Sequence, residues 1–517
     1  MISTRRAFLS DLGKGMIAAG LGNGLAADLG LAPIWAGEEP KELTFGHLEP
    51  LVRLLQDTEP RKLISTLVEK LNAGTELKQL VQAATLANVR TFGGEDYVGF
   101  HTMMAIGPAW EMVKELPDAE RPLPVLKVLY RNTNRIQEFG GRAKEVLRPV
   151  DAKAGEAGTG PADFIRGAVH QKQVRDAESM LAGTTHDSPE AGLNALLPVV
   201  EEAAEVHRIV MVWRAWELLD IVGRANAHTM LRQSIHYCAS MRDSTMPHFQ
   251  KMRNAVPKLL DQHKLVGRKP GTREADTAWV REMGKTIFES SPEQAAGAVA
   301  GAIAEGFSVA AITEAIRLAT NELIMRDKGR PKNQTSPNKP EGSVHGDSIG
   351  VHACDSANAW CNLARVSDQR NSVMCMLLGG YQAAFDRINR GGDFLKWEAH
   401  PTAGESQKLG TNDAAKLLAI AEDAIKAKDQ LRAMAAVGAY GNAEHSPKPL
   451  FDLFLKYAIS EDGALHAEKF YRTVSQAFQS TRRELRWRHV AGLARVTASE
   501  YGYPAPGVDE AKKLLKV

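Results

Sequence analysis

Apolar residues recur every three to four positions along most of the chain, which is the spacing that places them on one face of an α-helix. Residues 191–241 follow this pattern with interruptions only at proline and glycine, and we expect one or two long core helices there. Residues 412–441 consist mainly of strong helix formers and end at glycine. Because the alternating pattern of strands is almost absent, the sequence predicts an all-α fold.

Helix boundaries and loops are also marked in the sequence. Ser291, Pro292 and Gln294 form a capping box with proline at the first helical position, and they open an alanine-rich run that predicts a helical hairpin. Gly- and Pro-rich stretches predict loops at 152–163, 182–192 and 326–342. No fixed-period repeat is present, so we expect a multi-helix bundle, in two lobes if residues 326–342 form a seam.

The first 36 residues differ from the rest of the chain. Arg5 and Arg6 precede Phe8 and Leu9, and a weakly apolar stretch rich in Gly and Ala follows. This order is typical of a twin-arginine export signal, although a chance arginine pair before an amphipathic helix would look similar. We expect a signal at 1–36, cleavage near Ala36, the twin-arginine translocase as a partner, and a periplasmic or extracellular domain spanning 37–510.

The amino-acid composition argues against some classes of function, as the charge balance and the apolar runs show. The chain has 517 residues, of which 44% are hydrophobic, and 64 basic residues balance 62 acidic ones without a long basic run. A nucleic-acid partner is therefore not expected. No run after the signal reaches the roughly 18 apolar residues of a membrane span. The four cysteines form no CxxC pair, and we interpret them as small buried side chains.

Histidines stand beside apolar residues in four segments of predicted helix. These segments contain His101, then His228 and His236, then His345 and His352, and finally His466 with Lys469. One such histidine is usually a core residue with a single hydrogen bond. Four imidazoles from separate helices could instead converge on a divalent transition metal, of which iron and zinc fit best.

Lys469 follows His466 by three residues, so both side chains would leave the same helix face. Burial and a nearby metal cation both disfavour the charged amine and lower its pKa. A neutral amine can react with carbon dioxide to give a carbamate, which binds metal through oxygen. The alternative is an exposed Lys469 paired with Glu461 or Glu468.

The segments GFHTMMAIGPAW, IHYC, VHACDSANAW and AISEDGALHAEKF, in this order, resemble motifs of the questin oxidase-like family. The resemblance implies a helical oxygenase that acts on aromatic or polycyclic phenolics through one non-haem iron. By resemblance, the metal ligands are His101, His236, His352, His466 and a carbamylated Lys469. The second segment departs from the family pattern, so His228 or His207 could replace His236.

Further residues are expected around such a centre. Bulky side chains would line a substrate pocket, namely Met103, Met104, Trp110, Trp213, Trp216 and Trp360. Polar side chains near the histidines in sequence would orient the imidazoles, namely Asp347, Asp355, Asn358, Glu217 and Asp462.

Two other function classes remain open from the sequence. A zinc or nickel hydrolase can also use histidines and a carbamylated lysine, although such sites are common in α/β barrels. An exported helical scaffold or binding protein would use the same buried histidines only for internal hydrogen bonds. No catalytic residue apart from the metal ligands is assigned.

Overall fold

Helices account for most of the chain in the computed structural model, which describes residues 42–153, 158–240 and 246–517. Within these residues there are isolated β-bridges but no strand. The prediction of an all-α fold is confirmed. The predicted export signal at 1–36 lies outside the described residues.

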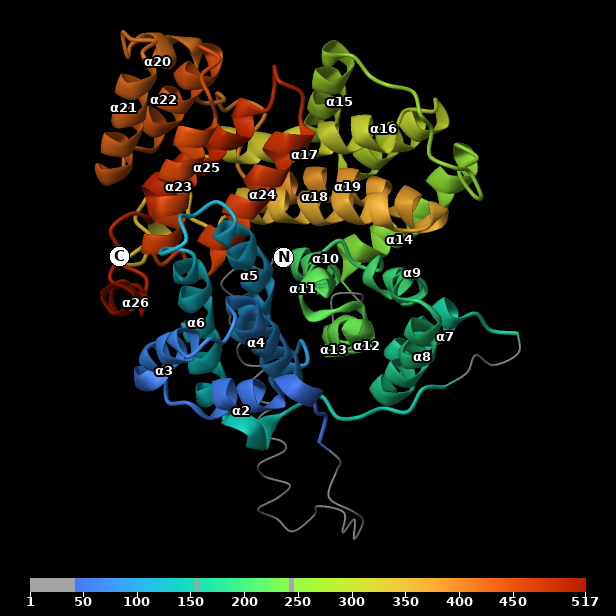
Figure 1. The fold of residues 1–517 in the computed structure, drawn as a ribbon. Coiled ribbons are helices and arrows are strands. Elements are labelled where there is room, and N and C mark those ends of the chain that lie inside the picture. The colour runs from blue at the N-terminus through green and yellow to red at the C-terminus, as the bar shows by residue number, and fades with distance from the viewer. Residues whose placement is uncertain (1–41, 154–157, 241–245) are drawn as a thin grey trace. The chain divides into compact units, whose positions relative to one another are not determined.

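The first group of helices, blue to green in Figure 1, comes from the N-terminal part of the domain. Its members are η1 (Gly46–Leu48), α2 (Glu49–Asp57), α3 (Pro60–Asn72), α4 (Leu77–Phe92), α5 (Tyr97–Val113), α6 (Pro122–Phe139), η2 (Gly141–Lys144), α7 (Pro161–His170), α8 (Val174–Asp187), α9 (Pro189–Val200), α10 (Val206–Glu217), α11 (Leu219–Val222), η3 (Arg224–Asn226), α12 (Ala227–Leu231) and α13 (Gln233–Ser240).

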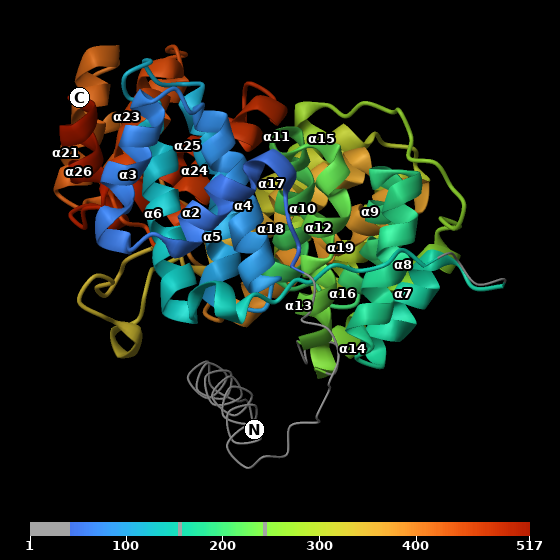
Figure 2. The ribbon, with the colours of Figure 1, turned by 60° about the horizontal axis from the view of Figure 1, so that its bottom comes forward.

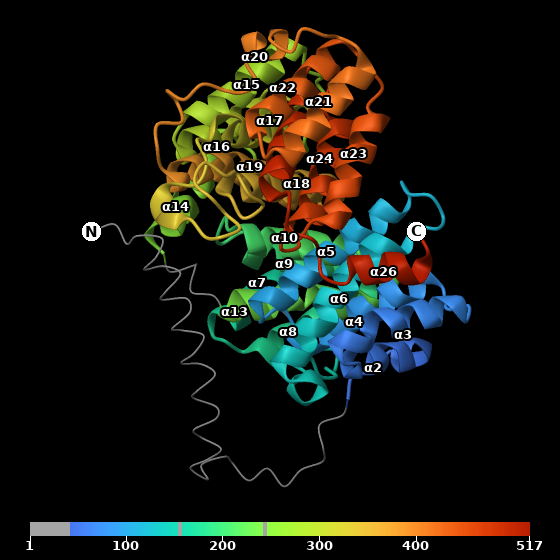
Figure 3. The ribbon, with the colours of Figure 1, turned by 90° about the vertical axis from the view of Figure 1, so that its left-hand side faces the viewer.

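The second group, yellow-green to red, lies on the other side of the domain in Figures 1 and 3. Its members are α14 (Pro247–Gln262), α15 (Thr277–Glu289), α16 (Pro292–Ala304), α17 (Val309–Arg326), η5 (Lys332–Gln334), α18 (Ile349–Val366), α19 (Gln369–Arg390), α20 (Ala403–Gln407), α21 (Ala414–Lys426), α22 (Gln430–Asn442), α23 (Lys448–Ser460), α24 (His466–Ser480) and α25 (Trp487–Glu500).

The two groups of helices belong to one unit. The last helix, α26 (Val508–Leu515), packs against α3 and α6 of the first group, so the domain extends beyond the expected end at 510. Residues Leu43–Val517 form a single unit. The expected seam at 326–342 is the connection between α17 and α18 within that unit.

Four helices form a closed ring where the two groups meet. Helix α5 packs against α24, α24 against α18, α18 against α10, and α10 against α5. All four lie near the centre of the view in Figure 2. Two helices of the ring come from each group, so residues far apart in sequence can meet inside it.

The one or two long helices expected at 191–241 are in fact a series of shorter ones. Residues 191–241 contain α9 to α13, because the chain leaves the helical path before Glu205, which caps α10, and again at Gly223, where φ is +89°. Residues 412–441 are divided between α21 and α22 at Lys428, where φ is +58°. The capping box of Ser291 and Gln294 is confirmed at the start of α16.

The apolar faces of the helices enclose a large core. All four cysteines are buried and none forms a disulfide, as the sequence indicated. Among the described helices, none is both long and apolar enough to cross a membrane.

Candidate functional site

Each helix of the ring contributes one histidine to a shared cluster. The residues are His101 on α5, His207 on α10, His352 on α18 and His466 on α24. Ring centroids are 4.9 Å apart for His101 and His207, 5.8 Å for His207 and His352, 5.3 Å for His352 and His466, and 5.6 Å for His466 and His101. The four imidazoles therefore form a closed group that follows the order of the helices.

Three of the imidazoles are anchored through Nδ1. His101 donates to the Tyr97 carbonyl at 2.6 Å, His207 to the Glu205 carboxylate at 2.6 Å, and His466 to the Gly463 carbonyl at 3.3 Å. A carbonyl oxygen and an ionised carboxylate only accept hydrogen bonds, so Nδ1 carries the proton in each of these rings. The lone pair of each neutral ring is consequently on Nε2.

The Nε2 atoms have few protein partners. In His352 and His466 these atoms are 3.2 Å apart. In His101 and His207 they are buried and have no hydrogen-bond partner among the residues that the structure describes. Buried polar atoms are usually paired, so these two nitrogens are available to a ligand.

The electrostatic environment favours the neutral form of His101, His352 and His466. Burial lowers the pKa of His101 and of His466 well below the usual value, and the positive charge of Lys469 lowers it further. Although part of the His352 surface is exposed, burial together with the charges of His207 and Lys469 lowers its pKa to about 3. Neutral imidazole is the form that binds a metal ion.

Glu205 is an acidic residue that forms a hydrogen bond with an imidazole of the cluster. Burial raises its pKa, but the charge and hydrogen bonds of His207 outweigh this effect and bring the pKa to about 2. Besides the imidazole, the carboxylate accepts hydrogen bonds from the backbone amides of His207 and Arg208 and from the Tyr237 hydroxyl. Glu205 is therefore an ionised and fully bonded partner that orients His207.

Lys469 lies one helical turn beyond His466 and is also buried, so the exposed alternative is wrong. Burial lowers its pKa to about 8, although the negative charge of Asp355 acts in the opposite direction. Asp355 itself accepts a hydrogen bond of 2.7 Å from the Thr473 hydroxyl. Lys469 is thus a buried amine with a lowered pKa beside a group of imidazoles.

The turn before His466 is strained. Ala464 and Leu465 have φ angles of +49° and +68°, which cost about 1–3 kcal/mol each for residues with a side chain. Lys127 supports this turn by donating to the carbonyls of Ala458 and Glu461, both at 2.7 Å. A strained conformation that is held by surrounding contacts is typical of functional sites.

His236 does not join the cluster, contrary to the expectation from the resemblance. Its Nδ1 contacts Glu95 at 2.8 Å and its Nε2 contacts Glu178 at 2.9 Å, so both nitrogens are engaged elsewhere. His228 is directed to the backbone carbonyl of Glu178 at 3.0 Å. His207, one of the two alternatives to His236, takes the fourth place in the cluster.

The polar residues expected to orient the imidazoles bind other groups. Asp347 pairs with Arg330 and Lys339, Asn358 donates to Gln476, Glu217 pairs with Arg214 and Arg472, and Asp462 pairs with Arg131. Sequence reasoning missed Glu205. Its position two residues before His207, at a helix start, was the available signal.

The imidazole nitrogens of the cluster are of a chemical type that binds metal ions. Two imidazole nitrogens bound to one ion at about 2.1 Å lie roughly 3 Å apart, which is close to the 3.2 Å between His352 and His466. Anchored Nδ1 atoms and inward lone pairs are the usual arrangement of metal-binding histidines. As the side chains stand, however, no group of three or more His, Cys, Asp or Glu residues in the described part of the chain could hold a metal ion. Side-chain adjustment would be required.

Comparisons with known proteins identified no relative of this chain. No protein-family model, no curated protein and no solved structure matches the chain.

Proposed function

We propose that His101, His207, His352 and His466 bind one iron ion, and that the protein is an exported metal-dependent oxidoreductase of the questin oxidase-like type. The observation that carries this proposal is the ring of four buried or partly buried imidazoles from four helices, three of them anchored through Nδ1. Imidazole ligands suit iron and zinc, and helices of a bundle fix their directions. When bound, iron would supply the activation of dioxygen.

Lys469 is proposed as a further ligand after carbamylation. Its buried amine has a pKa of about 8, so about a tenth of it is neutral at pH 7, far more than for an ordinary lysine. The neutral nitrogen adds to the carbon of carbon dioxide, an N–C bond forms, and one proton is released to solvent. The resulting carbamate has a charge of −1, which would offset the positive charge of the metal.

The substrate is proposed to be an aromatic or polycyclic small molecule. Tyr97 and Phe100 pack against His101, with ring centroids 4.4 and 4.9 Å away, and Tyr97 is 47% exposed. One side of the imidazole cluster therefore lies behind an aromatic residue at the surface. Planar substrates stack favourably on such rings, whose edges and faces carry opposite partial charges.

Metal analysis of the full chain, purified without chelator, tests the proposal. We expect about one iron per chain, lost in His352→Gln. His489→Gln is the matched control, because His489 is a buried imidazole on α25 that bonds to Thr481 at 3.1 Å outside the ring. Equal metal content in the two variants would contradict the proposed centre.

The identity of the metal separates the function classes. Zinc or nickel in place of iron would favour the hydrolase, in which a metal-bound hydroxide attacks a carbonyl. A chain without stoichiometric metal, even after addition of ferrous iron, would favour the scaffold or binding protein.

A further inference from the structure

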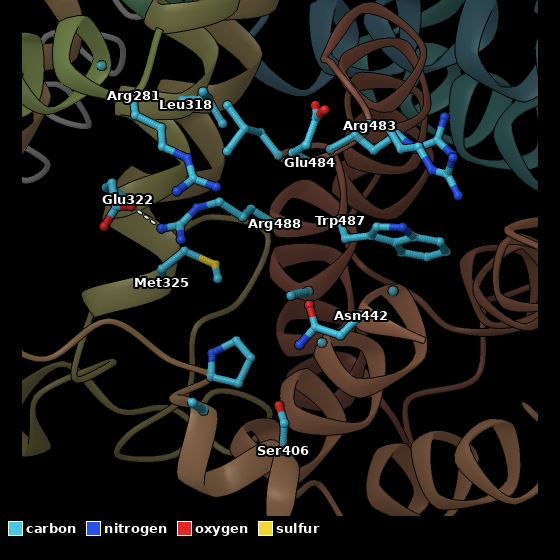
Figure 4. A pocket seen from close by; sticks show the side chains of 18 of the residues that line it. Arg281, Leu318, Glu322, Met325, Ser406, Asn442, Arg483, Glu484, Trp487 and Arg488 are labelled. Atoms are coloured by element: carbon cyan, nitrogen blue, oxygen red, sulfur yellow. Dashed lines mark hydrogen bonds and ion pairs between the residues drawn. The ribbon is translucent and has the colours of Figure 1, made fainter. Parts of the chain in front are cut away.

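A second feature of the domain is a polar cleft that contains none of the four clustered histidines. It has a volume of about 960 Å³ and is lined by residues of α15, α17, α20, α22 and α25 (Figure 4). Small-molecule sites commonly have volumes of about 300–1,000 Å³. The cleft is therefore large enough to hold a small ligand of its own.

Two arginines of the cleft share a single carboxylate, and a third arginine lies nearby. Arg326 binds Glu322 at 2.8 Å, and Arg488 binds the other oxygen of the same side chain. In Figure 4, Arg281 and Arg488 point toward one another from different helices, close to Glu322. Arg281 forms no hydrogen bond or ion pair with any residue that the structure describes. One carboxylate therefore serves two guanidinium groups, and Arg281 has no anion among the described residues.

The whole lining carries an excess of positive charge. The basic residues are Arg281, Lys285, Arg326, Arg483, Arg486 and Arg488, and the acidic residues are Glu289, Glu322, Glu444 and Glu484. Six positive and four negative groups leave a formal charge of +2 (6 − 4). Glu444 is already paired with Arg483 at 2.6 Å. Repulsion between converging guanidinium groups is relieved when a second anion enters.

We propose that this cleft binds a small, multiply charged anion, either a phosphorylated or a polycarboxylate compound, through Arg281 and Arg488. Guanidinium groups present paired N–H donors that match the oxygens of phosphate and carboxylate. Apolar parts of the ligand would contact Met325, Pro401 and Trp487 on the walls of the cleft. This site is separate from the proposed metal centre and does not depend on it.

Calorimetric titration of the full chain with inorganic phosphate and with citrate, at constant ionic strength in sodium chloride, tests the proposal. Arg281→Gln should weaken binding at least about tenfold, because a charge-assisted pair is lost. Glu322→Gln should strengthen binding, because the competing internal anion is removed. Arg175→Gln is the matched control, since Arg175 is an exposed arginine on α8 without a partner in the described residues, and its variant should bind normally.

The two probes also identify the ligand class. Tighter binding of phosphate would assign a phosphorylated ligand, and tighter binding of citrate a polycarboxylate. The proposal is overturned if neither anion binds beyond the effect of chloride, or if Arg281→Gln and Arg175→Gln weaken binding equally. Unchanged or weaker binding in Glu322→Gln would also overturn it, and thermal denaturation would show that each variant is folded.

Discussion

The carboxylate of Glu205 accepts a hydrogen bond of 2.6 Å from Nδ1 of His207 and also caps the helix that begins beside it. The bonds to the amides of His207 and Arg208 fix the start of α10, and the bond to the imidazole fixes the tautomer and direction of the ring. One side chain thus joins the local folding of α10 to the placement of a proposed metal ligand.

Replacing Glu205 with glutamine should weaken metal binding without removing a ligand. The amide keeps one oxygen as an acceptor but loses the charge, so both the imidazole and the helix start are held less firmly. We expect a loss of about 10- to 100-fold in metal affinity, measured by competition with a chelator. The loss of the ionised cap should also cost about 1 kcal/mol of stability.

Glu202→Gln is the matched control for this variant. Glu202 contacts His170 at 2.7 Å, so it belongs to a carboxylate and imidazole pair outside the helix ring. Its variant should retain the metal affinity of the parent protein. Equal affinities for the two variants would show that Glu205 does not orient a ligand.

His207 and His236 should differ in their effect on the metal. His207→Ala removes one of the four clustered imidazoles and should abolish most of the iron content. His236→Ala should leave the iron content unchanged, because both ring nitrogens of His236 are bonded to glutamates. Iron loss in His236→Ala together with iron retention in His207→Ala would restore the ligand set implied by the resemblance.

The difference between His207 and His236 shows which part of the site could not be predicted from the sequence. Helical periodicity predicted the all-α fold, and the segments around His101, His352 and His466 pointed to residues that do meet. The choice among His207, His228 and His236 depends on where the chain leaves one helix and begins the next. That is decided by the cap at Glu205 and the turn at Gly223, whose tertiary partners are remote in sequence.

Because His236 forms ion pairs only when it is protonated, the free energy of unfolding should decrease as the pH becomes alkaline. Burial lowers the pKa of His236, but Glu178 and Glu95 raise it to a net value of about 9, above the roughly 6.5 of an unfolded chain. The stabilisation is fully present below about pH 6.5 and is lost as the pH rises through about 9. The difference in unfolding free energy between the parent and His236→Gln should therefore shrink by about 3 kcal/mol from pH ~6 to pH ~10.

Urea denaturation across this range measures the effect. His489→Gln serves as the comparison, because burial lowers the pKa of His489 to about 3 and the imidazole stays neutral throughout. The difference in unfolding free energy between His489→Gln and the parent should stay the same as the pH rises. A pH-independent difference for His236→Gln would mean that the imidazole is not charged in the folded protein.

Lys469 provides a test of the carbamate that does not rely on activity. Lys469→Ala and Lys469→Arg should both lose most of the metal, because neither side chain can form the carbamate. Bicarbonate with a short-chain carboxylic acid should partly restore metal binding in the alanine variant, where space is left, and not in the arginine variant. Carbon-13 NMR of the parent protein in labelled bicarbonate should show a carbamate signal. Unchanged metal content in Lys469→Ala would remove the lysine from the site.

The buried ion pair of Lys127 and Glu468 should be essential to stability. The charged atoms are 2.6 Å apart and both side chains are almost fully buried, so Lys127→Met would leave an uncompensated carboxylate in the core. We expect a loss of about 3–5 kcal/mol. The comparable change in an exposed pair, Lys448→Met beside Asp452, should cost less than about 1 kcal/mol.

A double variant separates the ion pair from the other role of Lys127. Adding Glu468→Gln to Lys127→Met removes the buried charge and should recover part of the lost stability, so the two changes should not be additive. The remaining loss would come from the carbonyls of Ala458 and Glu461, which Lys127 holds in the turn before His466. Because that turn positions a proposed ligand, the double variant should still bind metal more weakly than the parent. Additive losses of stability would show that the two charges act independently.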